Sequence, residues 1–148
     1  MPSKQATSVW WTSGGNARQA DAQHYNELAE WCERLDPAEQ RRGFERILGE
    51  MTDSGDHGAG TRKDTALQWV SSLAESGAFE SAAIALIPRS ATFTGGRMKD
   101  GAFVAQVIPE GSAGAHSRNA QSLSMAWLAA LLRALARQSI EVQATPPH

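Results

Sequence analysis

The sequence predicts an α+β fold: an N-terminal αα-hairpin, then helices packed on a small antiparallel β-hairpin or sheet, and a long C-terminal helix. Apolar residues recur at helical spacing over residues 17–51 and again over 119–138. Between these segments, apolar residues alternate with other residues in two short stretches. The two stretches are joined at Lys99-Asp100-Gly101, a sequence typical of hairpin turns. One layer of sheet covered by helices is the architecture that these observations favour.

The first part of the chain is predicted to contain a flexible tail over residues 1–13 and the helical hairpin over 14–55. One face of the first helix is apolar and consists of His24, Leu28, Trp31, Cys32 and Leu35. The opposite face is charged and consists of Asp21, Glu27, Glu30, Glu33 and Arg34. Asp36, Pro37 and Glu39 have the spacing of an N-cap, a first-turn proline and a capping-box acid, so a second helix is expected to begin there.

Residues 52–62 contain three glycines and no large apolar side chain, so they are interpreted as a loop between two parts of the chain. The second part, 61–140, is predicted to be an α-β-β-α domain followed by a frayed tail over 141–148. Its third helix should run over 63–76 and end at Gly77, and its inward residues should be Leu67, Trp69, Val70 and Leu73. A short fourth helix over 79–86 should stop at Pro88.

The sheet is predicted from alternating residues over 91–94 and 103–108. Gly95-Gly96 suggests a bulge or a close approach of another part of the chain, and residues 109–118 are interpreted as a loop. Two strands are marginal alone, so we expect a third from residues 5–12, from 140–144, or from a second copy across a dimer.

Composition restricts the class of protein. The 148 residues, 41% hydrophobic and 20% charged, are typical of a globular domain, and the net charge of −2 disfavours strong non-specific nucleic-acid binding. Residues 1–60 carry six Lys/Arg and ten Asp/Glu, whereas 61–148 carry eight and six. No segment resembles a signal peptide or a membrane span, and a single cysteine, Cys32, excludes an intramolecular disulfide. A cytoplasmic location is therefore expected, with no membrane partner.

No pattern of reactive side chains predicts catalysis, a metal or a cofactor, so we expect a protein that is not an enzyme. Cys32 and His24 share a helix, but their spacing of eight residues separates them by about 12 Å along its axis, too far for a hydrogen bond. Asp53, Asp56 and His57 lie together, yet they do not match a calcium loop and are better explained as exposed loop residues. A hydrolase or transferase using these three residues stays open as a third hypothesis.

The residues predicted to bind a partner are Trp10, Trp11, Glu27, Glu30, Arg97 and Lys99. The tryptophan pair is an aromatic anchor for a partner, or one ring that pins the tail to the core. Arg97 and Lys99, with Arg89 and Arg118 nearby in the sequence, could contact nucleic acid, or could simply protect a solvated hairpin edge.

Residues 79–136 resemble the phage ABA sandwich domain. The resemblance rests on an Ala-Ile-Ala-Leu-Ile-Pro element over 83–88, the strand pair over 93–108 and the Ala/Leu-rich helix over 126–135. It covers about two fifths of the chain. The last helix starts with Ala-Gln-Ser over 120–122, where the family has an Ala-Thr-Pro-like start. The resemblance implies a phage or mobile-element origin and no catalytic residues.

The leading hypothesis is therefore a non-enzymatic interaction protein of phage or mobile-element origin. It would bind a host or viral protein, and inhibition of a host defence complex, as by an anti-CRISPR protein, is one form of this activity. A second copy of the chain is a further partner to consider. The alternative hypothesis is a small nucleic-acid-binding accessory factor that uses the basic hairpin.

Overall fold

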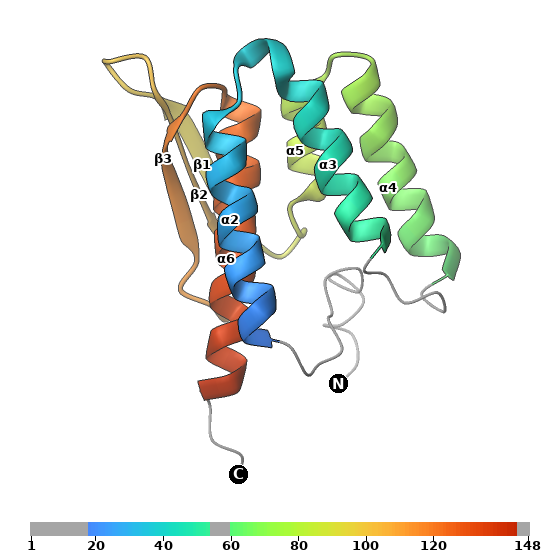
Figure 1. The fold of residues 1–148 in the computed structure, drawn as a ribbon, viewed down its shortest axis with the longest axis vertical. Helices are drawn as coiled ribbons and strands as arrows, with labels where there is room; N and C mark the ends of the chain where they lie inside the picture. Colours follow the sequence, from blue (N-terminus) through green and yellow to red (C-terminus); the bar gives the residue numbers. More distant parts are fainter. Residues whose placement is uncertain (1–17, 54–59, 145–148) are drawn as a thin grey trace.

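The computed structural model describes residues 18–53 and 60–144, and its fold is α+β (Figure 1). The described elements, in order, are α2 (Arg18–Arg34), η2 (Pro37–Glu39), α3 (Gln40–Asp53), α4 (Gly60–Glu75), α5 (Phe79–Leu86), β1 (Thr92–Arg97), β2 (Phe103–Ile108), β3 (Ala115–Ala120) and α6 (Leu123–Ala144). The predicted fold class is confirmed, including the helices that precede the strands and the long helix that follows them.

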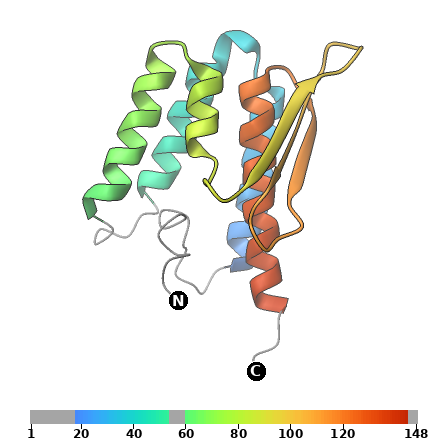
Figure 2. The same cartoon turned by 180° about the vertical axis from the view of Figure 1, so that it is seen from behind.

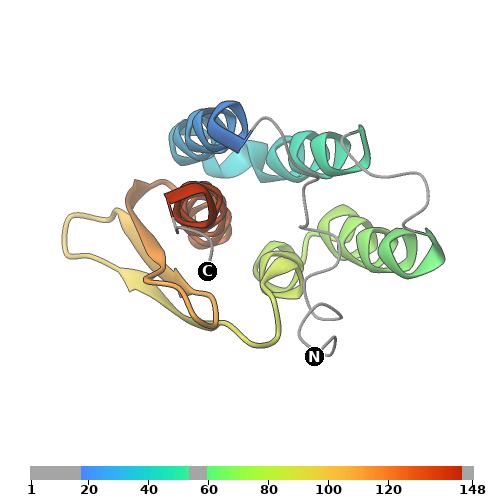
Figure 3. The same cartoon turned by 90° about the horizontal axis from the view of Figure 1, so that it is seen from below.

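Helix α6 is the centre of the packing. It lies between the sheet and α2, as the view along the helices shows (Figure 3). On its other side α5 connects it to α4, and α3 packs against α4. The two helices of the predicted hairpin thus have different main partners, because α2 packs on α6 and α3 packs on α4. One continuous cluster of buried apolar side chains includes residues from both parts of the chain, such as Phe44, Val107 and Leu128.

The connection between α2 and α3 differs in detail from the predicted capping box. The Asp36 side chain makes no capping hydrogen bond. Its backbone carbonyl instead accepts a hydrogen bond from the amide of Glu39 at 2.8 Å, which closes the single 3₁₀ turn Pro37–Glu39. Pro37 occupies this first turn as predicted, because its missing N–H is not needed there. The α-helix proper begins one turn later, at Gln40.

Helix α4 ends as its sequence predicts. Gly77 has a φ of +87°, and the amides of Gly77 and Ala78 donate to the carbonyls of Ala74 and Leu73 at 3.0 and 2.9 Å. This is the Schellman arrangement, which requires the left-handed conformation that glycine adopts most easily. One expectation for α4 is wrong: Trp69 does not point inward but is 59% exposed. The helix buries only a narrow stripe against α3 and α5, and Trp69 lies outside it.

The first two strands form the predicted hairpin. Thr92 pairs with Ile108 and Arg97 with Phe103, and the hairpin loop extends past the first turn of α6 (Figure 2). Only Gly101 in the turn has a positive φ, +94°, whereas Asp100 does not. The Asp100 side chain instead accepts a hydrogen bond from the amide of Ala102 at 3.0 Å. The turn is therefore stabilised by one glycine and one side-chain acceptor, not by two left-handed residues.

The third strand comes from a segment that we interpreted as loop and helix start. Residues 115–120 form β3, which pairs antiparallel with β2, so α6 begins at Leu123 and not near residue 119. The expectation of a third strand is right, but its predicted source over 140–144 is wrong, because those residues belong to α6. The other predicted source, 5–12, lies outside the described residues. Helix α6 also continues to Ala144, beyond its predicted end.

The face of the sheet that packs on α6 explains the glycine pair in β1. A Cβ added to Gly95 would lie 2.8 Å from Nε1 of Trp127 and 3.1 Å from Cδ1 of Leu123, whereas one added to Gly96 would meet nothing within 4 Å. The Trp127 indole lies against Gly95, donates to the carbonyl of Thr94 at 3.1 Å and meets Phe93 edge-on. The predicted close approach is confirmed at Gly95.

Candidate binding groove

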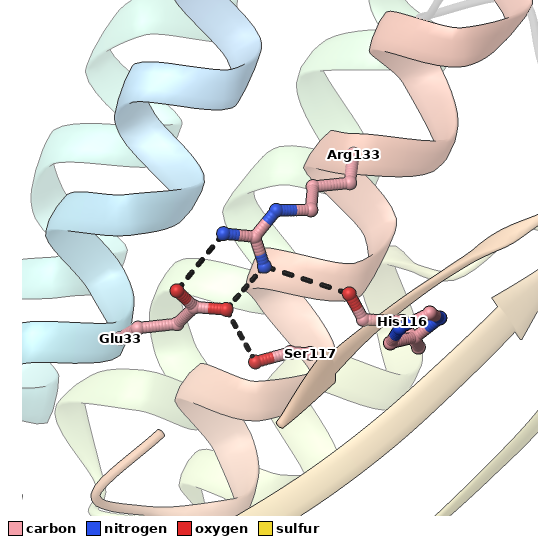
Figure 4. A network of polar contacts seen from close by, with 4 residues as sticks. All are labelled: Glu33, His116, Ser117 and Arg133. Atoms are coloured by element: carbon pink, nitrogen blue, oxygen red, sulfur yellow. Dashed lines mark hydrogen bonds and ion pairs between the residues drawn. The ribbon is translucent and has the colours of Figure 1, made fainter. Parts of the chain in front are cut away.

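A carboxylate and a guanidinium from opposite parts of the chain meet beside the edge of the sheet (Figure 4). Glu33 on α2 accepts two hydrogen bonds from Arg133 on α6, one from Nη1 to Oε2 and one from Nη2 to Oε1 at 2.9 Å. Ser117 on β3 donates to Oε2 of the same carboxylate at 2.7 Å. Three elements are therefore joined at one side chain.

Burial of Glu33 alone would disfavour its charged form. The hydrogen bonds from Arg133 and Ser117 and the charge of Arg133 outweigh this effect, and the pKa of Glu33 is lowered. The same hydrogen bond is the main reason that the pKa of Arg133 is raised. The Glu33 side chain is only 14% exposed and the Arg133 side chain 27%, so the two ions form a partly dehydrated pair.

Ser117 and His116 are neighbours in the sequence, but they do not form a catalytic pair. The Ser117 hydroxyl is directed to Glu33, and Ser117 is 1% exposed. The His116 imidazole points away from the carboxylate, and His116 contributes its backbone carbonyl, which accepts from Arg133 at 3.5 Å. The side chains of Glu33, Arg133 and Ser117 thus hydrogen-bond to one another, and they fix β3 relative to α2 and α6.

A groove of about 510 Å³ lies directly beside this cluster. One wall is α2, with Asn26 and Glu33, and the opposite wall is β3, with Arg118. The floor is α6, with Arg137 and Ile140. A volume of this size is within the range of small-ligand and peptide pockets.

The side chains of the groove combine positive charge with an apolar contact. Arg118 is exposed and makes no ion pair with any side chain that the structure describes. Arg137 donates to the carbonyl of Gly114 at 3.4 Å. Ile140 is 49% exposed at the floor. The groove can therefore attract an anionic group and cover part of an apolar side chain.

Those predicted partner-binding residues that the structure describes lie on separate elements. Trp10 and Trp11 lie outside the described residues. Glu27 and Glu30 are exposed on α2, whereas Arg97, at the end of β1, and Lys99, in the hairpin loop, are exposed on the sheet. The sequence thus placed charged residues correctly on the surface, but the two acids and the two cations belong to separate elements.

The residues considered for chemistry have ordinary structural surroundings where they are described. Cys32 is fully buried, and burial raises the pKa of its thiol to about 12. Nε2 of His24 lies 2.9 Å from Oε1 of Glu50 on α3. The Cζ atom of Arg46 lies 4.7 Å from the centre of the Trp31 ring. Asp56 and His57 lie outside the described residues, and within the described part no three His, Cys, Asp or Glu side chains could hold a metal.

Sequence reasoning missed the groove and its ion pair. It assigned Glu33 to the solvated face of the first helix, whereas Glu33 faces α6 and β3. One signal was available: Arg133 is a lone charge within the apolar run 125–136 of α6. A cation in such a position requires a partner, since an unpaired charge is rarely buried. Nothing local in the sequence points to Glu33 as that partner.

Comparison with known proteins yields no family model, no curated protein and no solved structure that matches this chain. Among the helices of the described residues, none is both long and apolar enough to cross a membrane.

Proposed function

We propose that the protein is a non-enzymatic interaction protein, and that it contacts a partner protein through the groove between α2 and β3. The observation that carries the proposal is the combination of an edge strand, a facing helix and the arginine Arg118 along one groove. The edge of a sheet is a site where another chain can pair. A cation beside that edge, such as Arg118, favours a partner with negative charge.

The rigidity of the groove supports a binding role. Its two walls are connected by Ser117, Glu33 and Arg133, so the spacing between α2 and β3 is fixed before a partner arrives. A preformed surface loses less conformational entropy on binding than one that must order itself. The resemblance to a phage domain suggests the partner's class: a host or viral protein, with a host defence complex as the specific target and the host cytoplasm as the location.

Site-specific photo-crosslinking tests this proposal. A photoreactive residue replaces Asn119 in one variant and Ser90 in a matched variant, because both positions are exposed but only Asn119 lines the groove, and Arg118 stays in place. Both variants are expressed in cells that carry the natural gene, and cross-linked proteins are identified by mass spectrometry. We expect one protein to be captured from position 119 and not from position 90, and to bind the purified chain stoichiometrically.

Equal capture from both positions, or no capture from either, would remove the groove from the function. The purified partner also permits a direct measurement of affinity, in which Arg118→Glu should weaken binding by about tenfold or more and Arg89→Glu should not.

A second candidate function, nucleic-acid binding, is favoured by one observation. The three strands contain no Asp or Glu, and Arg97, Lys99 and Arg118 are exposed on or beside them. If a nucleic acid binds here, its affinity should fall steeply with salt and should fall further in an Arg97→Gln, Lys99→Gln variant. Absence of a mobility shift at low salt would end this alternative.

A further inference from the structure

We infer that the groove binds an extended, acidic segment of the partner protein, which pairs with the free edge of β3 as a fourth strand. The inference rests on the proposed function and names the chemistry of the partner. Within the described residues β3 pairs with β2 alone, and it is the strand that lies nearest α2 (Figure 3). Residues of β3 line the groove, so the unpaired edge of β3 borders it. Addition of an extended peptide to such an edge is a common mode of peptide recognition.

The backbone acceptors of this edge are held only loosely. The carbonyl of Gly114, just before β3, accepts from Nη1 of Arg137 at 3.4 Å, and the carbonyl of His116 accepts from Nη1 of Arg133 at 3.5 Å. Both distances exceed the 2.7–3.2 Å range that is usual for N–H···O hydrogen bonds. A peptide N–H at the usual distance would replace these contacts with stronger ones.

The length of β3 sets the length of a segment that can pair with it. β3 is six residues long, which corresponds to roughly 20 Å of extended chain. The wall formed by α2 lies opposite, so a peptide inserted beside β3 would contact α2 with its other edge and α6 with one face. Ile140, exposed on that floor, provides an apolar contact for an inward side chain of the peptide.

Charge selects an acidic segment. Arg118 has no ion pair among the described side chains. Glu33, the one carboxylate among the described residues that line the groove, already binds Arg133. A peptide carboxylate near Arg118 would therefore form a new, charge-assisted hydrogen bond without displacing an existing pair.

A peptide fits this surface better than a nucleic acid does. Glu27 and Glu30 are exposed on α2, and the charge of Glu30 adds a small contribution to the raised pKa of Arg133. These carboxylates would repel a continuous line of phosphates, whereas a peptide with alternating side chains can direct its acids toward β3 alone.

The test uses the full chain and a peptide probe of alternating valine and glutamate, with the six-residue length of β3. Backbone amide signals are followed by NMR during titration. We expect shifts at His116, Arg118 and Asn119, and about tenfold or more weaker binding by Arg118→Glu. Arg89→Glu, which changes the net charge equally, should bind as the parent does. A probe of alternating valine and lysine should not bind.

A second probe isolates the strand pairing. Methylation of alternate backbone nitrogens removes the donors that face β3 but keeps every side chain, so it should abolish the shifts. Equal binding of the methylated probe would overturn the inference, as would an oligonucleotide that shifts the same amides when the acidic probe does not. If the acidic probe fails while cross-linking at position 119 still captures a protein, only this inference falls. If cross-linking also fails, the proposed function falls too.

Discussion

Glu33 and Arg133, one hundred residues apart in the sequence, form a two-point ion pair that joins the first and last described helices. Since Ser117 donates to the same carboxylate, the pair also fixes the edge strand. Its partial burial decides its energetic role. Pairs this protected cost more to break than surface pairs, because a remaining ion loses its partner and stays dehydrated.

We predict a clear coupling between these two side chains. In a double-mutant cycle with Glu33→Gln and Arg133→Gln, each single change should lower the free energy of unfolding by about 1–3 kcal/mol, and the double change should cost less than the sum. Urea denaturation measures the four proteins. The exposed pair Glu39–Arg42, with N–O distance 3.7 Å, is the control, and its coupling should be below about 1 kcal/mol. Equal coupling in both cycles would contradict the role assigned to burial.

The same pair predicts how stability depends on pH. The pKa of Glu33 is lower in the folded protein than its ordinary value of 4.5. The unfolded state therefore binds a proton more readily, and the stabilisation from Glu33 is complete above pH 4.5 and is lost as the pH falls through the folded value. Unfolding free energies should be compared between the parent and Glu33→Gln across this window. Their difference should shrink on acidification, and a constant difference would contradict the assignment.

The two adjacent glycines of β1 should respond differently to the same change. Gly95→Ala places a methyl group 2.8 Å from the Trp127 indole, within a packed contact, so it should destabilise the fold by about 1–3 kcal/mol. Gly96→Ala meets nothing within 4 Å and should be neutral or slightly stabilising. Thermal unfolding of both variants is the measurement. The prediction fails if Gly96→Ala is the more damaging of the two.

Cys32 should react slowly with thiol reagents while the protein is folded. It is fully buried and the pKa of its thiol is raised to about 12, so very little thiolate is present or accessible at neutral pH. The reaction with a disulfide reagent should become fast only in denaturant. A Cys32→Ala, Ser90→Cys variant, with its thiol at an exposed position, is the control and should react at once. Rapid labelling of the native parent would show that this part of the core opens readily.

The sequence was informative where local chemistry determines structure. Helix α5 was predicted with its observed bounds, because Gly77 and Pro88 limit it on both sides. The hairpin β1–β2 was predicted from its alternation and from Gly101. The first turn after α2 was predicted less well, since Asp36 and Glu39 can close a 3₁₀ turn through the backbone alone.

Strand β3 could not be recognised because its inward residues are small and give only a weak apolar signal. They are Ala115, Ser117 and Ala120, and Ser117 is buried because it donates to Glu33. The groove was missed for a different reason: it depends on contacts between segments that are distant in the sequence. Trp69 was placed inside by helical spacing, but spacing does not reveal that the other described elements contact α4 on only part of its surface.

The central position of α6 has a consequence for how the molecule folds. α2 and the three strands are all synthesised before the helix on which they pack. During translation, their apolar surfaces would stay uncovered until α6 has left the ribosome. Contacts between segments so distant in the sequence also form slowly, because long loops must close first. Chains interrupted before residue 123 should therefore be recognised by chaperones and proteases as unfinished, because the emerging helices have nothing to fold around.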